Sequence, residues 1–203
     1  MKSDYMHTRS PQTEQLISLI RQNESFTSWL RAVRTQGLSS WCIGAGAVRN
    51  LVWDALAGRS APSALADVDV AYFDATEISG ERDAELQRAL EALAPNVPWE
   101  VTNQAGVHQW FESVFGRAVA PLHSLEDAIA TWPEFVTCIG VTLTEHDEIR
   151  VIAPHGVQTL DDLFSMTIRH NALRATVANY DARVAKKNYA ARWPSVTILP
   201  AQC

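Results

Sequence analysis

The stretch that decides the fold is Trp41–Phe73, WCIGAGAVRNLVWDALAGRSAPSALADVDVAYF. It begins with a short apolar run, passes through the turn Gly44–Gly46, continues in a helical pattern and ends in a second apolar run opened by Asp67 and Asp69. Side chains alternate faces along a strand, so these two carboxylates project from one face and Val68 from the other. Two carboxylates this close repel each other, and we expect a cation between them.

The composition is that of an ordinary globular protein. Of the 203 residues, 47% are hydrophobic and 20% are charged, which is enough apolar content for a sizeable core. We predict a single domain over residues 1–203, with a disordered segment at 1–10 and N-terminal helices over 11–37. The net charge of −6 argues against a non-specific nucleic-acid binder, which is usually basic.

The cysteines and the N-terminal segment bear on the cellular compartment. Cys42, Cys138 and Cys203 are far apart and have no CxxC spacing, which favours neither a disulfide scaffold nor a zinc site. The N-terminal residues contain no apolar signal segment, and no apolar run approaches the length of a membrane span. We therefore expect a cytoplasmic protein that does not enter the membrane.

Hydrophobic periodicity predicts a mixed α/β or α+β fold. The predicted strands lie at 41–43, 69–73 and 99–102, with an antiparallel hairpin at 137–143 and 149–153. The predicted helices lie at 47–57, 83–93, 125–131, 160–166 and 180–190. An aromatic segment at 108–115 has no clear period, and an apolar run closes the chain at 196–199.

A glycine turn joins the first predicted strand to the first helix of this arrangement. Backbone N–H groups at the start of a helix can approach a phosphate closely, and the helix dipole favours the negative charge. A plain structural turn explains Gly44-Ala45-Gly46 equally well. The turn alone therefore does not assign a function.

The paired aspartates favour the phosphate interpretation. Asp67 and Asp69 can chelate Mg²⁺, a hard cation that prefers carboxylate oxygens and leaves room for substrate phosphates. Two such ions would hold the attacking and leaving oxygens of a phosphoryl or nucleotidyl transfer. Glu100, inside the strand predicted at 99–102, is the candidate third carboxylate, and a solvent-facing strand residue is the alternative interpretation.

A dinucleotide-binding fingerprint is the main rival interpretation. It combines GxGxxG with an acid about twenty residues later, and Asp67 lies near that distance from Gly46. Arg49, however, stands where the third glycine would allow close helix–strand packing. The two acids also begin their strand, whereas the acid of the fingerprint ends one. We keep dinucleotide binding as a minor alternative.

Other polar residues have both a structural and a functional interpretation. Asn103 and Gln104, followed by His108, could read a base, orient an acceptor or satisfy buried backbone groups. The predicted helix at 180–190 carries Arg183 and Lys186-Lys187, which could attract a polyphosphate or form a solvated basic face.

The layout of glycine turn, helix and Asp-x-Asp resembles the nucleotidyltransferase superfamily typified by DNA polymerase β. A set of longer segments resembles, more specifically, a bacterial nucleotidyltransferase-like family formerly classed as a domain of unknown function. The resemblance covers about residues 12–200, and these segments carry it: GAVRNLVWDALAG, DVDVAYFD, WEVTNQAGVHQWF, Trp132-Pro133-Glu134 and IRVIAPHGVQTLDDLFSMTIRHN.

The resemblance implies a polymerase-β-like fold, a mixed sheet flanked by helices. It implies that Asp67 and Asp69 are metal ligands, and Glu100 matches the strand that supplies the third carboxylate. The implied cofactor is Mg²⁺, as two ions, with Mn²⁺ as a substitute.

The resemblance also implies a nucleotide-binding segment. Gly44, Ala45 and Gly46 would lie beside the triphosphate, and Arg49 would contact it or hold the carboxylates. The superfamily usually has Gly or Ser where this chain has Ala45, so a possible hydroxyl contact to phosphate is missing while the backbone N–H donors remain.

Taken together, these features predict a nucleotidyltransferase. It would move a nucleoside monophosphate from Mg-NTP to an unidentified small-molecule or protein acceptor and release pyrophosphate, with Asp67, Asp69 and Glu100 as its catalytic and metal-binding residues. Asn103 and Gln104 would join the nucleotide-binding residues. The acidic net charge argues against nucleic acid as acceptor. A catalytically silent regulator that binds nucleotide or a partner protein is the alternative.

Overall fold

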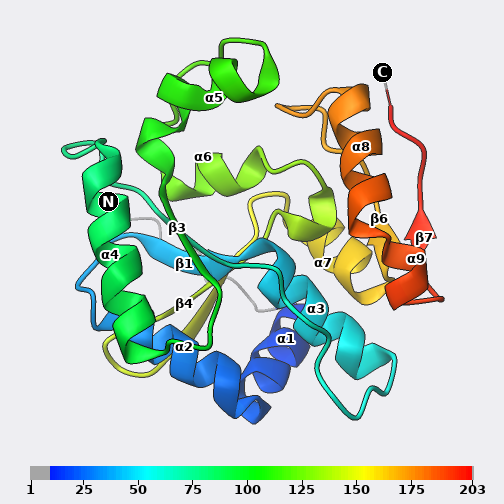
Figure 1. Cartoon of the computed structure of the whole chain (residues 1–203). Coiled ribbons are helices and arrows are strands. Elements are labelled where there is room, and N and C mark those ends of the chain that lie inside the picture. Colours follow the sequence, from blue (N-terminus) through cyan, green and yellow to red (C-terminus); the bar gives the residue numbers. More distant parts are fainter. Residues whose placement is uncertain (1–9, 203) are drawn as a thin grey trace, which may run out of the picture.

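The computed structural model describes residues 10–202 (Figure 1). Residues 1–9, most of the segment predicted to be disordered, and Cys203 lie outside the described residues. The strands are β1 (Trp41–Gly44), β2 (Val68–Tyr72), β3 (Trp99–Asn103), β4 (Gly140–Leu143), β5 (Ile149–Ile152), β6 (Thr167–Ile168) and β7 (Thr197–Ile198). The helices are α1 (Pro11–Gln22), α2 (Glu24–Arg34), α3 (Ala45–Leu56), α4 (Gly80–Leu93), α5 (Val107–Phe115), α6 (Leu125–Ala130), α7 (Val157–Phe164), α8 (Val177–Lys187) and α9 (Tyr189–Arg192).

A mixed five-stranded sheet organises the described part of the chain, as the sequence predicts. The strand order is β3-β2-β1-β4-β5, in which β2 and β3 run parallel and the other neighbours are antiparallel. Strands β6 and β7 form a separate parallel pair. The polymerase-β-like arrangement of a mixed sheet flanked by helices is therefore confirmed.

The two faces of the sheet are covered differently, because strand side chains alternate. Val68 and Val70 of β2 point into the main core, which α1, α2, α3 and α4 help to build. Ala71 points to the opposite face and packs against Leu125 and Ile129 of α6. Asp69 shares this second face with Ala71. In Figure 1 the helices α1 and α2 lie below the sheet, while α5 and α6 lie above it.

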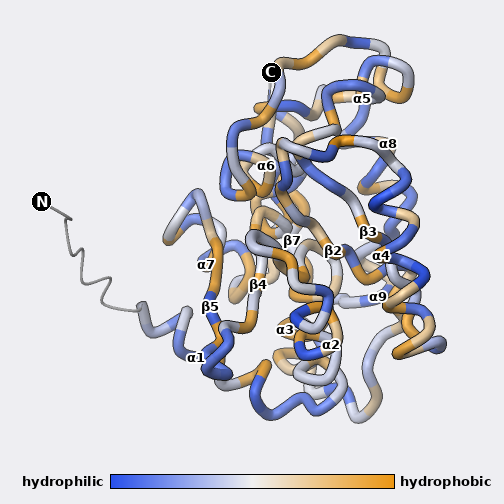
Figure 2. Tube along the Cα trace, turned by 90° about the vertical axis from the view of Figure 1, so that its left-hand side faces the viewer, coloured by the Kyte–Doolittle hydropathy of each residue, from blue (hydrophilic) through white to orange (hydrophobic). Residues whose placement is uncertain are grey.

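Polar side chains cap the N-terminal ends of several helices. The Asn23 side chain accepts the Phe26 N–H at 2.8 Å, and so caps α2. The Ser124 hydroxyl accepts the Asp127 N–H at 3.0 Å at the start of α6. Figure 2 shows apolar and polar segments alternating along the trace, as expected when each helix buries one face. Within residues 10–202, the helices are too short or too polar to cross a bilayer.

Several predicted boundaries differ from the structure by about three residues, and two of the differences have a local cause. The first hairpin strand begins at Gly140 instead of residue 137, because Phe135–Thr137 forms a 3₁₀ turn. The predicted helix at 180–190 is divided into α8 and α9, because Asn188 adopts a left-handed conformation with φ of +46°. The aromatic segment that lacked a clear period forms α5.

Candidate active site

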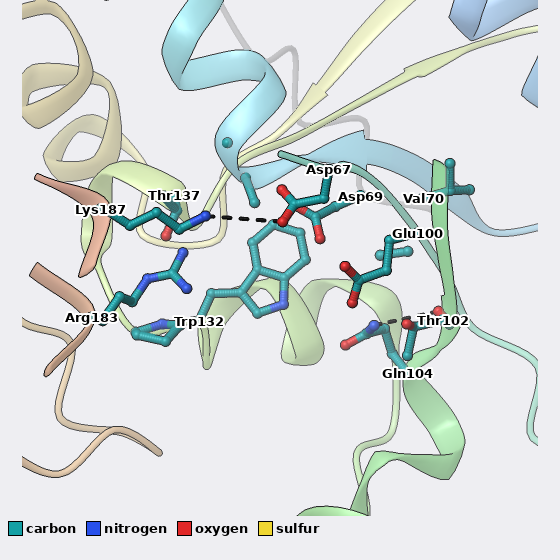
Figure 3. A pocket seen from close by; sticks show the side chains of 14 residues that line it. Asp67, Asp69, Val70, Glu100, Thr102, Gln104, Trp132, Thr137, Arg183 and Lys187 are labelled. Carbon is teal, nitrogen blue, oxygen red and sulfur yellow. Dashed lines mark hydrogen bonds and ion pairs between the residues drawn. The ribbon is translucent and has the colours of Figure 1, made fainter. Parts of the chain in front are cut away.

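A cavity of about 230 Å³, here called the carboxylate cavity, opens between the start of α3, the ends of β2 and β3, and α8 (Figure 3). It collects residues from segments far apart in the chain. Six of its lining residues are among those predicted from the sequence: Ala45, Gly46, Asp67, Asp69, Glu100 and Gln104.

The three predicted carboxylates meet at one wall of this cavity. Asp69 and Glu100 are direct partners in the parallel β2–β3 register, so their side chains lie next to each other on one face of the sheet. Asp67 stands two residues before Asp69, and Figure 3 shows their carboxylates side by side. Burial, together with charge repulsion from Asp67 and Glu100, raises the pKa of Asp69 to about 7. The wall is therefore strongly anionic.

The glycine turn forms the adjoining wall. A Cβ at Gly44 would lie 2.7 Å from the Trp132 ring and 2.8 Å from the Ile139 carbonyl oxygen, so only glycine fits beneath that ring. Ala45 opens α3 with φ of +48°, in the left-handed region that costs a residue with a Cβ. A Cβ at Gly46 would lie 3.9 Å from Asp67 Oδ1. Gly46 thus leaves the backbone open beside the carboxylates.

The start of α3 presents backbone donors to the same cavity. Its N-cap is Gly44, which has no side chain to cap the first turn. Ala45 N–H is bound to the Ile139 carbonyl at 3.2 Å, which leaves the following first-turn donors to an incoming ligand. A helix N-terminus beside a cavity is suited to an anion such as phosphate.

Two cations on α8 face the anionic wall. Lys187 Nζ lies 4.0 Å from Asp67 Oδ2, and the Arg183 guanidinium lines the same cavity. Burial lowers the pKa of Lys187 and outweighs the attraction of Asp67. Burial also works against the charge of Arg183, but its ion pair with Glu134 raises the pKa overall.

A buried network holds Arg183 in place. Glu134 is fully buried, and its Oε1 lies 3.1 Å from Arg183 Nε and accepts the Tyr189 hydroxyl at 2.8 Å. The Tyr189 hydroxyl in turn accepts from Arg49 at 3.3 Å. The Glu134 carboxylate therefore contacts Arg183 of α8 directly and Arg49 of α3 through the Tyr189 hydroxyl.

Arg49 lies behind the glycine turn, where a Cβ at Gly46 would be 3.7 Å from its Nη2. Its side chain is 1% exposed and does not line the carboxylate cavity. The guanidinium lies 5.5, 4.9 and 5.9 Å from the ring centres of Trp53, Tyr189 and Trp193. It also donates to Asn50 at 2.8 Å. These contacts make Arg49 a buried support that acts through Tyr189 and Glu134.

Asn103 and Gln104 have different surroundings in the structure. The buried Asn103 amide donates to the carbonyls of Asp74 and Glu77 at 2.8 and 2.6 Å, and its oxygen accepts the Asp74 N–H. These bonds fix the loop after β2 and leave Asn103 outside the cavity lining. Gln104, by contrast, lines the cavity beside Glu100.

Comparison with known proteins identifies the family to which this chain belongs. A family model described as nucleotidyltransferase matches residues 31–198, which is most of the chain. The chain belongs to the nucleotidyltransferase family. The match extends from the second helix through the glycine turn, the carboxylate strands and α8. Among curated proteins, this nucleotidyltransferase has no match.

Solved structures show the same fold. An NMR structure described as revealing a CCA-adding enzyme head domain is 26% identical, with a TM-score of 0.77, and the match covers 95% of this nucleotidyltransferase and 98% of that chain. Two structures of a tRNA-processing enzyme, an apo form and a complex, are 15% and 16% identical, each with a TM-score of 0.50. They match 89% and 84% of this nucleotidyltransferase, which spans 44% and 43% of their length. At that identity the likeness shows the fold alone.

The turn Trp132-Pro133-Glu134 supplies site residues that sequence reasoning missed. Trp132 and Pro133 line the cavity, and the Asn171 amide donates to the Trp132 carbonyl at 2.8 Å. Both the turn and Asn171 fall in segments that resemble the bacterial family. Thr102 and Thr137 also line the cavity, and no sequence pattern marks either of them.

The three carboxylates of this nucleotidyltransferase offer oxygen donors of the kind that bind a divalent metal ion. Within residues 10–202, no three His, Cys, Asp or Glu side chains converge closely enough to hold a metal ion by themselves. Mg²⁺ usually binds through one or two carboxylates and completes its shell with water and substrate phosphates. A wall of three carboxylates, in which burial and mutual repulsion raise the pKa of Asp69, fits such an ion.

Proposed function

We propose that this nucleotidyltransferase moves a nucleoside monophosphate from an NTP to the hydroxyl of an acceptor and releases pyrophosphate. One observation carries the proposal. The three carboxylates, the uncapped start of α3 and the cations of α8 all open into one cavity. Carboxylates alone would repel a triphosphate, and cations alone would not orient the reacting oxygens, so their combination favours phosphoryl chemistry.

Asp67, Asp69 and Glu100 would hold Mg²⁺, as two ions, with Mn²⁺ as a substitute. When bound, the metal neutralises phosphate charge and orients the attacking and leaving oxygens. The chain's own residues supply the rest. The first turn of α3 would bind phosphate oxygens through its backbone, and Lys187 and Arg183 would stabilise the departing pyrophosphate.

The transfer balances as a single in-line displacement. The acceptor oxygen forms a bond to the α-phosphorus while the bond from that phosphorus to the bridging oxygen of the β-phosphate breaks. The bridging oxygen and its electron pair leave with pyrophosphate. Glu100, the most exposed of the three carboxylates, can accept the hydroxyl proton and pass it to solvent.

We propose a small molecule or a protein side chain as the acceptor. A neighbouring structure is described as a CCA-adding enzyme head domain, but the net charge of −6 argues against nucleic acid here. We place the reaction in the cytoplasm, where NTPs and Mg²⁺ are present.

Thermal unfolding with each NTP, with and without Mg²⁺, tests the proposal. At saturating NTP we expect a rise in Tm of roughly 5–10 °C that requires Mg²⁺. The double variant Asp67→Asn/Asp69→Asn should lose this rise, while the matched variant Asp147→Asn, on an exposed turn, should retain it.

Two other outcomes would contradict the proposal. If no NTP shifts the Tm of the wild type, nucleotide binding itself is refuted. If NTP binds but no acceptor in a cell extract gains label from an α-labelled NTP, the protein is a silent nucleotide-binding regulator instead.

A further inference from the structure

A second cavity, here called the aromatic cavity, adjoins the first. Its volume is about 260 Å³, and it shares Asp69, Glu100 and Gln104 with the carboxylate cavity. Trp132 lines both cavities, and Figure 3 shows its indole between the Lys187 side and the Glu100 side. The aromatic cavity therefore reaches the same carboxylates from the side away from α8's cations.

Aromatic rings from α5 form the walls of the aromatic cavity. Trp110, Phe111 and Phe115 all line it, and the Phe111 and Phe115 ring centres are 4.5 Å apart. Trp110 and Phe115 are each 43% exposed, which is unusual for side chains of this size. Exposed rings around a cavity are suited to stacking on a planar ligand.

A cationic side chain completes the aromatic cavity. Arg174 lines it, with its guanidinium carbon 5.7 Å from the Phe111 ring centre. Arg117 donates to the Arg174 backbone carbonyl, which brings a second cation close. Among residues 10–202, neither arginine forms an ion pair with an acid. Arg174 donates through Nη2 to the Ala120 carbonyl, and its Nη1 is buried without a hydrogen-bond partner. An anionic group on a ligand would supply the missing counter-charge.

The geometry of in-line displacement indicates a role for the aromatic cavity. The acceptor oxygen must approach the α-phosphorus from the side opposite the departing pyrophosphate. Lys187 and Arg183 mark the pyrophosphate side, and the aromatic cavity lies across Trp132 from them, next to Glu100. A molecule in the aromatic cavity would therefore present its hydroxyl beside the carboxylate that can accept the proton.

We propose that the acceptor is a small planar aromatic molecule that carries a hydroxyl and an anionic group and binds in the aromatic cavity. This inference rests on the proposed nucleotidyl transfer and specifies its acceptor. The rings of α5 stack on the planar part, and Arg174 binds the anion. The volume of about 260 Å³ lies just below the roughly 300–1,000 Å³ of typical ligand pockets, so we expect a ligand of no more than one or two fused rings.

Binding of 6-hydroxynaphthalene-2-sulfonate, a fluorescent hydroxylated aromatic anion, tests the inference. We expect saturable binding to the wild type and at least a tenfold weaker affinity for Arg174→Met. The neutral analogue 2-naphthol should bind weakly and should not distinguish the two proteins. Arg150→Met removes an exposed arginine on β5 and serves as the matched charge control.

A second variant controls for the case in which Arg174→Met fails to fold. Trp110→Ala removes an exposed ring and should weaken the binding of both naphthols while leaving the Mg-NTP shift in Tm intact. If Arg174→Met and Trp110→Ala both bind the sulfonate as the wild type does, the inference is overturned. The same holds if the wild type binds Mg-NTP but not the sulfonate, and in that case the proposed function survives.

A nucleotidyl-transfer assay distinguishes between the possible acceptors. A cell extract is divided into small-molecule, protein and RNA fractions, and each is incubated with the enzyme and α-labelled NTP. Label in an aromatic anion of the small-molecule fraction, lost with Arg174→Met, supports the inference. Label confined to the protein or RNA fraction overturns it. Binding of the sulfonate without any binding of NTP overturns both the inference and the proposed function.

Discussion

The carboxylate cavity and the aromatic cavity share a wall but differ in almost every other respect. The first is lined by acids, an open helix terminus and two cations, and its far wall rests on the buried Glu134. The second is lined by exposed rings and an arginine without an acidic partner among the described residues. Trp132 separates them.

We infer from this difference that the two cavities bind different partners. A triphosphate is the same in every NTP, and a network of fixed charges suits it. An acceptor is recognised by its shape and by a few polar groups, and exposed rings suit that task. The two halves should therefore respond to different substitutions.

Glu134→Gln should have the largest effect on the free energy of unfolding, and it changes only the support of the carboxylate cavity. It leaves the half-buried Arg183 without its partner, and we expect a loss of roughly 3 kcal/mol in the free energy of unfolding, or about 6–12 °C in Tm. Urea unfolding and calorimetry measure the change. Glu145→Gln, on an exposed turn, is the control and should be neutral. A neutral Glu134→Gln would show that the network does not hold the cations.

Lys187→Met should weaken NTP binding by about 10- to 100-fold, because a charge-assisted contact to phosphate is worth roughly 1.5–3 kcal/mol. Titration calorimetry with Mg-NTP measures the affinity. The exposed neighbour Lys186 provides a matched control, and Lys186→Met should change the affinity little. Binding of the naphthol sulfonate should be the same in both variants. Equal losses of NTP affinity in the two variants would mean that net charge matters and position does not.

Asp69→Asn should stabilise the metal-free protein, since Asp69 belongs to both cavities. Burial and its acidic neighbours raise its pKa from 3.8 to about 7 in the folded state, so its ionisation opposes folding above pH 4. The gain from Asn should be near zero at pH 4 and should reach roughly 1 kcal/mol above pH 7, after allowance for solvent. Thermal unfolding in EDTA across this pH range measures it. A gain independent of pH would contradict this cause.

Ala45→Gly should have the smallest effect, a gain of about 0.5 kcal/mol. The residue has φ of +48°, and glycine adopts this conformation without strain, although its greater freedom in the unfolded state offsets part of the gain. Thermal unfolding gives the sign, and Mg-NTP affinity should be unchanged because the backbone donors remain. A clear loss of NTP affinity would show that the Ala45 methyl contributes to the nucleotide site.

Local sequence patterns predicted the fold class and the core of the carboxylate wall. Asp67 and Asp69 lie on one face because strands alternate, and this needs no long-range information. That Glu100 stands beside Asp69 depends on the parallel pairing of β2 with β3, which no local pattern specifies. The resemblance to a known family supplied that step.

The remaining site residues depended on tertiary contacts. Lys187 comes to Asp67 from a helix more than a hundred residues later, and its basic face alone could have been solvated. Asn103 was predicted to bind nucleotide, but its amide holds the loop after β2. The resemblance implied that Arg49 contacts the triphosphate or holds the carboxylates, and no sequence pattern showed that its guanidinium packs among aromatic rings. The sequence alone does not show which backbone groups a polar side chain near a motif will bind through hydrogen bonds.

The most direct test of the central claim compares α-labelled with γ-labelled NTP in the presence of Mg²⁺ and the small-molecule fraction of a cell extract. We expect the acceptor to gain the α-label and the γ-label to leave as pyrophosphate in equal amount, and we expect Asp67→Asn/Asp69→Asn to abolish both. Transfer of the γ-label to the acceptor would contradict it, because phosphate and not nucleotide would then be the group that moves.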